Sequence, residues 1–265
     1  MDLQLSGKRA LVTGGNRGIG LAIARGLLRE GAHVVIAARD RSALDDAATA
    51  LASETGGKVG VVCVDTRDDA SVDALVVEAV ALLGGLDIVV NAAAQPGFAG
   101  APGIAGLDSA RLMEEINTKV IGYMRVARAA APHLIAGGWG RIINISGLAA
   151  RQARSIPNSV RNIAVAAMTK GLADELGPKG VNVTVVHPGM TRTERTPDLI
   201  ARHAAANGIT AQEAEKGFAA GTLIGRLVSA EEVADVVAFL ASPRSIAING
   251  DAIAAGGGTP VAIHY

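Results

Sequence analysis

Short apolar runs alternate along the chain with longer stretches in which apolar residues recur at helical spacing. A strand that is buried on both faces is apolar throughout, so the short runs predict strands of a parallel sheet. These runs cover residues 9–13, 33–37, 59–64, 86–90, 141–145, 181–187 and 251–255. The longer stretches predict helices over residues 19–30, 42–54, 69–83, 108–136, 157–176 and 229–241, with Ser42 as the cap of the second.

The repeated strand–helix–strand order predicts an α/β fold, because parallel strands need long crossover connections that pack on the sheet. We expect a Rossmann-like doubly wound parallel sheet of about seven strands, with helices on both faces. No linker or shift in composition divides the chain, so residues 1–265 are expected to form a single domain. The least regular stretch, 191–225, is Ala-rich from residue 201 to residue 221 and is expected to form a substrate lid.

The composition and net charge of the chain exclude several classes of function. Aromatic residues make up 2% of the chain against 49% hydrophobic residues in total, so the core must consist of Ala, Val, Ile and Leu. The formal net charge is zero and no basic block occurs, which argues against nucleic acid as a partner. The single cysteine, Cys63, excludes a disulfide framework and a cysteine-based metal cluster. The chain begins without a signal-peptide pattern and has no apolar run of membrane-spanning length, so we expect a soluble cytoplasmic protein.

A glycine-rich segment joins the first strand to the first helix, with the sequence Thr13-Gly14-Gly15-Asn16-Arg17-Gly18-Ile19-Gly20. Glycines at this point let the backbone approach a pyrophosphate, which then lies at the positive end of a helix. The same glycines would also suit a plain tight turn. Their position between strand and helix favours a dinucleotide site, with predicted contacts at Gly14, Asn16, Arg17, Gly18, Ile19 and Gly20.

The end of the second strand indicates which dinucleotide binds. An NAD site usually has an acidic residue there, whereas this chain has Ala38 followed by Arg39. A guanidinium matches the charge and geometry of a 2′-phosphate, and Arg17 in the glycine loop adds a second positive group. We therefore favour NADP(H), with NAD as the alternative if Arg39 is a solvated loop charge beside Asp40.

Several further motifs follow in order, and together with the glycine loop they resemble the short-chain dehydrogenase/reductase family over nearly the whole chain. The segment Asn91-Ala92-Ala93-Ala94 matches the family's Asn-Asn-Ala-Gly loosely, and Ser146 after Ile143-Asn144-Ile145 matches its catalytic serine. The resemblance implies that Asn117 is a relay asparagine on the long helix and that Asp65 lies at the adenine ring. It also implies that the segment after Pro188 holds the nicotinamide carboxamide. The implied cofactor contacts are Asp65, Thr66, Asn91, Ala92, Pro188, Gly189, Thr191 and Thr193.

The resemblance fails at the family's Tyr-x-x-x-Lys pair. Counting back from Ala166-Ala167-Met168-Thr169-Lys170 puts Asn158 at the tyrosine and Asn162 at the lysine; counting forward from Ser146 gives Ser159 and Ile163. In the family the tyrosine exchanges a proton with the substrate oxygen, and the lysine lowers the tyrosine pKa and binds the ribose. An amide does not titrate in the useful range, so Asn158 is left with hydrogen bonding to a carbonyl and Asn162 with binding ribose hydroxyls.

The expected catalytic set is therefore Ser146, Asn117, Asn158 and Asn162, without a metal. Loss of a positioned general acid costs about 10²–10⁴ in rate, so hydride transfer would need another proton source. His187 is one candidate, although a packed residue at a strand end is the simpler interpretation. The chain's tyrosines, Tyr123 and Tyr265, lie far from this helix in sequence, and Tyr265 is expected in a solvated tail. Arg161 is offset from Asn162 by about 100° around the helix, which predicts a different face.

Four arginines flank the expected substrate pocket: Arg151, Arg154, Arg192 and Arg195. They either receive an anionic substrate group or lie at loop edges as surface charges.

Three functions remain open. The first is an NADP(H)-dependent oxidoreductase that acts on a small-molecule alcohol/carbonyl pair through a rewired proton path. The second is a silent subunit that binds nucleotide or supports an active homologue in a hetero-oligomer. The third is a lyase, isomerase or cyclase that reuses the cleft without redox chemistry. The Ala-rich faces of the helices 108–136 and 157–176 suit the contact by which the resembled family dimerises, so a homo-oligomer or hetero-oligomer is expected.

Overall fold

The computed structural model describes residues 1–94, 104–153 and 155–261, and it contains a seven-stranded parallel sheet. The strand order is β3-β2-β1-β4-β5-β6-β9, so the order reverses between β1 and β4. The strands are β1 (Arg9–Thr13), β2 (His33–Ala38), β3 (Val59–Cys63), β4 (Ile88–Asn91), β5 (Gly140–Ile145), β6 (Val181–Pro188) and β9 (Ala252–Ala255). The predicted doubly wound α/β fold is confirmed, because the apolar runs of the sequence form the buried strands of this sheet.

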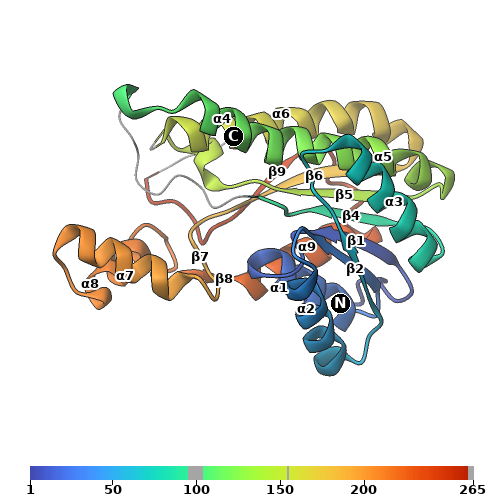
Figure 1. The fold of residues 1–265 in the computed structure, drawn as a ribbon, viewed down its shortest axis with the longest axis horizontal. Coiled ribbons are helices and arrows are strands. Elements are labelled where there is room, and N and C mark those ends of the chain that lie inside the picture. Colours follow the sequence, from blue (N-terminus) through green and yellow to red (C-terminus); the bar gives the residue numbers. More distant parts are fainter. Residues whose placement is uncertain (95–103, 154, 262–265) are drawn as a thin grey trace.

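Helices cover both faces of the sheet, as Figure 1 shows. One apolar cluster packs α1 (Gly18–Arg29), α2 (Arg41–Thr55) and α9 (Ala230–Ala241) against one face. A second cluster packs α3 (Asp69–Leu83), α5 (Gly122–Ala136) and α6 (Ile156–Leu176) against the other. Both clusters are built from small and branched aliphatic residues, as the composition requires.

The helix predicted over 108–136 is interrupted. It consists of α4 (Ser109–Ile116), a π-helical turn η2 (Asn117–Ile121) and α5. The backbone N–H of Gly122 donates to the carbonyl of Asn117, five residues earlier, which defines the wider turn. Such turns inside α-helices often lie at functional sites, because they change which side chains face a neighbour.

Side chains cap the amino ends of α2 and α9. Asp40, not Ser42, caps α2, because its side chain accepts from the backbone N–H of Ala43. Ser229 caps α9 as part of a capping box with Glu232.

The stretch predicted to be least regular contains two helices, α7 (Thr196–Asn207) and α8 (Ala211–Ala219). They pack on each other through Ile200, Ala204, Ala214 and Phe218. Figure 1 shows them beyond the sheet, connected to it near the short strands β7 (Thr191–Arg192) and β8 (Val228–Ser229).

The chain's one tryptophan, Trp139, immediately precedes β5. The ammonium of Lys8 lies 4.0 Å from the Trp139 ring centroid, and the guanidinium of Arg141 lies 4.5 Å from it. Arg141 is buried and donates to the carbonyls of Gly140 and Ser242, so these contacts tie the start of β5 to the end of α9.

Among the described residues, no helix has the length and apolar character needed to span a membrane.

Candidate active site

A cleft of about 1110 Å³ lies at the carboxyl ends of the parallel strands. Its walls come from the residues that follow β1, β2, β3, β4, β5 and β6, around the point where the strand order reverses. Open α/β sheets bind their ligands at this position. The predicted site residues that line it are Gly14, Asn16, Arg17, Gly18, Ile19, Gly20, Arg39, Asp65, Thr66, Ala92, Ser146, Gly189, Thr191 and Thr193.

The glycine loop forms one wall, and two of its glycines cannot carry a side chain. A Cβ on Gly14 would lie 2.8 Å from the carbonyl oxygen of Ala92, and Gly14 also has a φ of +68°. A Cβ on Gly20 would lie 2.2 Å from the carbonyl oxygen of Gly14. The loop therefore keeps its backbone exposed to the cleft, as close approach to a pyrophosphate requires.

A carboxylate of the protein itself is hydrogen-bonded to this loop. The carboxylate of Glu194 accepts a hydrogen bond of 3.2 Å from the backbone N–H of Gly18 at the start of α1. Backbone N–H groups at a helix start bind anions, so this carboxylate stands where a phosphate oxygen would be held. The donors of the loop thus fit a dinucleotide pyrophosphate.

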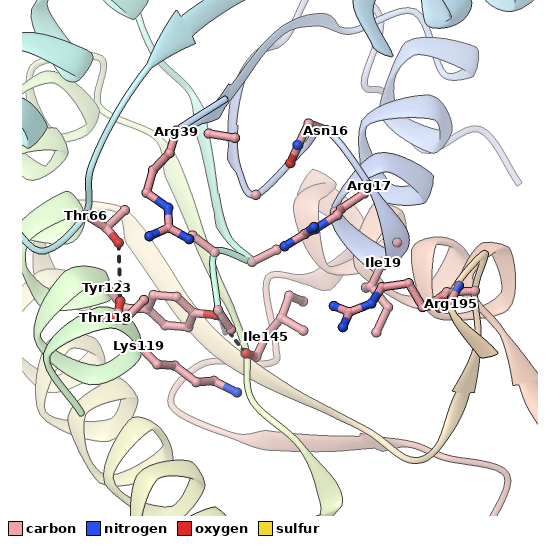
Figure 2. A pocket seen from close by; sticks show the side chains of 18 of the residues that line it. Asn16, Arg17, Ile19, Arg39, Thr66, Thr118, Lys119, Tyr123, Ile145 and Arg195 are labelled. Atoms are coloured by element: carbon pink, nitrogen blue, oxygen red, sulfur yellow. Dashed lines mark hydrogen bonds between the residues drawn. The ribbon is translucent and has the colours of Figure 1, made fainter. Parts of the chain in front are cut away.

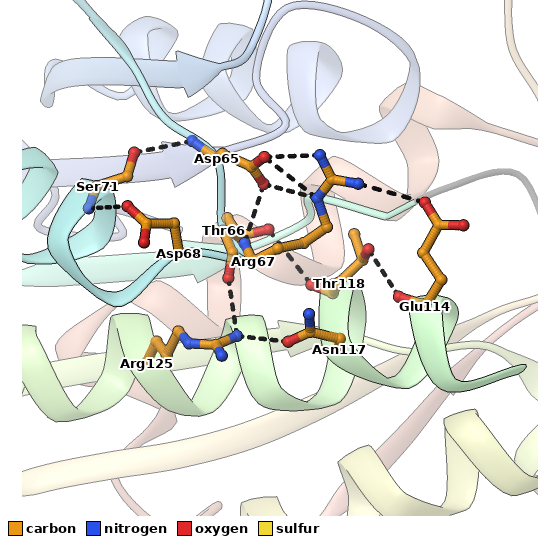
Figure 3. Close-up of polar contacts among 9 residues, drawn as sticks. All are labelled: Asp65, Thr66, Arg67, Asp68, Ser71, Glu114, Asn117, Thr118 and Arg125. Carbon is orange, nitrogen blue, oxygen red and sulfur yellow. Dashed lines mark hydrogen bonds and ion pairs between the residues drawn. The ribbon is translucent and has the colours of Figure 1, made fainter. Parts of the chain in front are cut away.

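Several arginines line the cleft. Figure 2 shows Arg17, Arg39 and Arg195 directed toward the pocket from separate segments of the chain. Asp65 lies nearby, where its carboxylate accepts from Nε and Nη2 of Arg67. This pair is linked to Glu114 through Arg67 Nη1 (Figure 3). The Arg67 guanidinium lowers the pKa of Asp65 to about 2, so the Asp65 carboxylate stays charged.

Two predicted cofactor contacts, Asn91 and Pro188, are not among the residues that line the cleft, but both lie next to lining residues. Asn91 is fully buried and donates to Asn144 Oδ1 at 2.9 Å, and Asn144 donates to Thr169 Oγ1 at 2.9 Å. This chain of amides joins β4, β5 and α6. Pro188 ends β6 and precedes Gly189, which does line the cleft.

The structure places Asn117 outside the cleft, which corrects the expected relay position. Its Oδ1 accepts from Arg125 Nη1 at 2.8 Å (Figure 3), and Asn117 is not among the residues that line the cleft. The physical reason is the π turn, which begins at Asn117 and turns Lys119 toward the cleft.

Lys119 occupies the inner end of the cleft, and its side chain points into the pocket in Figure 2. The residue is 4% exposed. Its Nζ donates to the carbonyl of Ser146 at 2.9 Å and to Asn162 Oδ1 at 2.8 Å. Burial lowers the pKa of Lys119 well below its usual value, and the positive charge of Arg161 lowers it further.

Ser146 and Asn162, both members of the expected catalytic set, lie in contact. The Ser146 hydroxyl lies 2.9 Å from the Asn162 carbonyl and 3.2 Å from Asn162 Oδ1. Asn162 is buried behind the wall, between Ser146 and Lys119. Asn158 lies one turn earlier on α6, and its Oδ1 is buried without a hydrogen-bond partner among the described residues.

Tyr123 also lines the cleft, one turn after Lys119. Its hydroxyl donates to the carbonyl of Ile145 at 3.0 Å (Figure 2), and burial raises its pKa. A buried phenol that already donates its one hydrogen is poorly placed to exchange protons with a ligand.

Arg161 lines the cleft as well, from a different face of α6 than Asn162. Its guanidinium pairs with Glu115 at 2.9 Å, and both side chains are buried. Asn162, on the neighbouring face, is buried against Ser146, so α6 presents two adjacent faces to the interior. Desolvation raises the pKa of Glu115 against the opposing effect of Arg161.

The remaining candidates are less favourably placed. His187 is buried, and desolvation lowers its pKa to about 4, so it is neutral near pH 7. The predicted basic cluster is dispersed: Arg151 donates to the carbonyl of Ala252, Arg192 pairs with Glu215, and Arg195 faces the cofactor end of the cleft. Arg154 and Tyr265 lie outside the described residues. The described residues contain no cluster of potential metal ligands.

Comparison with known proteins agrees with this geometry. A family model described as enoyl-(acyl carrier protein) reductase matches residues 14–259. Human dehydrogenase/reductase SDR family member 4 is 34% identical over 97% of this chain and 88% of its own length. Gluconate 5-dehydrogenase of Gluconobacter oxydans is 33% identical over 98% of this chain and 97% of its own. The chain belongs to the short-chain dehydrogenase/reductase family.

A solved structure of this family is similar over almost every residue. L-sorbose reductase from Gluconobacter frateurii, complexed with NADPH and L-sorbose, matches with a TM-score of 0.91 at 31% identity. The match covers 99% of this chain and 100% of the reductase.

Sequence reasoning missed Lys119 and Tyr123 as residues of this short-chain dehydrogenase/reductase cleft. The signal was present, because Lys119-Val120-Ile121-Gly122-Tyr123 places a lysine and a tyrosine one helical turn apart in an otherwise apolar segment. A charged residue on an apolar helical face is an exception that calls for a buried partner or a function.

Proposed function

We propose that this chain is an NADP(H)-dependent oxidoreductase that interconverts an alcohol and a carbonyl compound through an atypical proton-transfer site. The observation that carries the proposal is a single cleft with Arg17 and Arg39 at one end and Ser146 with Lys119 at the other. The NADPH complex of the similar L-sorbose reductase supports the choice of cofactor.

The chain's own residues fit each part of the cofactor. The backbone of the glycine loop would hold the pyrophosphate, and Arg39 with Arg17 would hold the 2′-phosphate. Asp65 and Thr66 would border the adenine, and the segment 189–193 the nicotinamide. When bound, NADP(H) supplies or accepts the hydride that changes the oxidation state of the substrate carbon.

The inner end of the cleft would then bind and polarise the substrate oxygen. Arg161 gives this end a positive charge, and Lys119 adds a second one in its ammonium form; both would stabilise an oxygen that becomes negative as its carbon is reduced. Asn158 and Asn162 replace the titrating pair expected in the family, so neither supplies a proton. This substitution is what makes the proposed site atypical.

We propose a neutral polyhydroxy carbonyl compound as the substrate class. The similar solved structure is a reductase of L-sorbose, which is a neutral polyhydroxy ketone. The dispersed arginines lend little support to an anionic substrate, because Arg151 and Arg192 already have partners. The segment 191–225 would cover the substrate as a lid, since Thr191 and Thr193 at its start line the cleft.

Cofactor binding tests the proposal first. In a fluorescence titration of the purified protein, NADPH is expected to bind more tightly than NADH. Arg39→Ala is expected to weaken NADPH binding by about 10–100-fold, because a hydrogen bond to a charged group contributes about 1.5–3 kcal/mol. NADH, which lacks the 2′-phosphate, should be almost unaffected.

Arg41→Ala is the matched control. Arg41 is exposed, pairs with Asp45, and is not among the described residues that line the cleft. Equal affinity for both cofactors in the wild type would contradict the role of Arg39. Failure to bind either cofactor would overturn the oxidoreductase proposal and favour a silent subunit or a cofactor-free enzyme.

A further inference from the structure

We propose that Lys119 is the acid–base residue of this chain, exchanging a proton between its Nζ and the substrate oxygen. The inference rests on the proposed oxidoreductase function and names the group that replaces the missing tyrosine. Lys119 comes from the π turn between α4 and α5, not from α6, where the sequence motif would place the proton donor.

The hydrogen bonds of Lys119 leave it one free hydrogen. An ammonium group has three N–H donors, and two of them are used by the Ser146 carbonyl and by Asn162 Oδ1. Both partners are fixed in the core, so Nζ is held in place at the inner wall of the cleft. The third N–H has no protein partner among the described residues and is available to a substrate oxygen.

Other hydrogen-bond donors of the cleft either donate to protein acceptors already or cannot release a proton. Ser146 has a single hydroxyl hydrogen, and both acceptors within its reach belong to Asn162. Tyr123 donates its single hydrogen to the Ile145 carbonyl. Arg161 stays protonated in proteins and therefore cannot exchange a proton with a substrate.

Two charged side chains and two uncharged titratable side chains surround Lys119. Arg161 on α6 opposes its positive charge, while Glu115 on α4 favours it. Glu115 is itself shared between Arg161 at 2.9 Å and Arg111 at 3.8 Å. His187 on β6 is neutral near pH 7, and Tyr123 on α5 is protonated.

Burial and the positive charge of Arg161 lower the pKa of Lys119 well below its usual value. An amine whose pKa lies closer to the operating pH exchanges protons more efficiently. A buried lysine can shift by several units when its charge is poorly compensated.

The step balances in atoms and charge. As the carbonyl carbon is reduced by the nicotinamide cofactor of the proposed function, its oxygen gains the electron pair of the C=O π bond. An O–H bond forms to that oxygen while one Nζ–H bond of Lys119 breaks, and the electron pair of that bond stays on the nitrogen. The resulting neutral amine recovers a proton from water, and alcohol oxidation runs the same steps in reverse.

The first experiment measures the ionisation of Lys119 directly in the cofactor-free protein. The chain contains six lysines, so ¹³C-lysine-labelled protein gives a small set of side-chain NMR signals. The signal that disappears in Lys119→Met is expected to titrate well below the 10.5 of an ordinary lysine. Titration at the ordinary value would overturn the inference whatever the activity.

The second experiment compares pH profiles of NADPH-dependent carbonyl reduction. In the wild type, kcat/KM is expected to fall as the pH rises through the pKa of Lys119, because the ammonium form is the acid. Lys119→Arg keeps the charge but cannot release a proton, so it should lose about 10²–10⁴ in kcat and also lose this pH limb. NADPH affinity should stay within about threefold, because Arg39 and the glycine loop are intact.

Lys170→Met is the matched control, because Lys170 is exposed on α6 and pairs with Asp174. Full activity with an unchanged pH limb in Lys119→Arg would overturn the inference and leave the proposed function standing. A wild-type protein that binds NADPH but reduces no carbonyl compound would instead contradict the proposed function, and the inference with it.

Discussion

His187 illustrates how a single buried residue couples the fold to pH. It is the penultimate residue of the buried strand β6, with 1% exposure, and its Nδ1 has no partner among the described residues. Burial lowers its pKa from 6.5 to about 4, so the folded protein holds this imidazole neutral. Between these two pH values, the unfolded chain binds a proton that the folded chain does not bind.

The unfolding free energy should therefore decrease as the pH falls from about 6.5 to about 4, by at most about 3 kcal/mol. His187→Gln should remove this part of the pH dependence. Urea unfolding curves recorded at several pH values for both proteins would measure the difference. Equal slopes of stability against pH in the two proteins would contradict the assignment.

At the scale of elements, replacing glycine by alanine is expected to have opposite effects at two positions of α1. Gly20→Ala places a methyl group 2.2 Å from the Gly14 carbonyl oxygen, so the loop must move. We expect this variant to lose NADPH binding by at least about tenfold, because the loop would no longer present its N–H groups together.

Gly26→Ala on the same helix is the control. There the new methyl group would make an ordinary contact of 3.6 Å with Ala234, so the helix should gain about 0.5–1 kcal/mol. Thermal unfolding and cofactor titration of both variants separate helix stability from loop geometry. Intact NADPH binding in Gly20→Ala would contradict the proposed loop function.

The order of elements was predictable from sequence, and the faces of one helix were not. Apolar runs specify strands directly, because strands buried on both faces need continuous hydrophobicity. The apolar pattern of 108–136 continues through the π turn, so it gives no sign of the extra residue per turn. That turn moves Asn117 toward Arg125 and brings Lys119 to the cleft, two residues later.

The cofactor end of the site was easier to predict than the catalytic end. Glycines and arginines act there through backbone conformation and charge, both of which follow from residue type and position. The catalytic end depends on contacts between residues far apart in sequence, such as Lys119 with Ser146 and Arg161 with Glu115. Spacing along one helix cannot reveal such pairs.

At the scale of the whole molecule, the helical layer on one side of the sheet carries exposed apolar side chains. They are Met113 on α4, Met124 on α5, and Val160 and Ile163 on α6, with exposures of 39–64%. Figure 1 shows these three helices in one layer. We propose that a second copy of the chain packs here, as the family resemblance implies.

Ile163→Asp should therefore shift the protein toward a monomer, because it places a charge in an apolar interface. Light scattering after size-exclusion chromatography would measure the mass. Val77→Asp on α3 is the control, since Val77 is 67% exposed and lies on a different helix. A wild-type monomer, or an unchanged mass in Ile163→Asp, would contradict this face as the interface.

The two cations against Trp139 have a spectroscopic consequence. Trp139 is the chain's only indole, and it lies at the amino ends of the strands, whereas the cleft opens at their carboxyl ends. In the cofactor-free protein its emission should therefore report the loss of the Lys8 and Arg141 contacts on unfolding. Reduced nicotinamide absorbs light where indole emits, so the two signals belong in separate cuvettes: indole emission without cofactor for folding, and the cofactor's own emission for occupancy of the cleft.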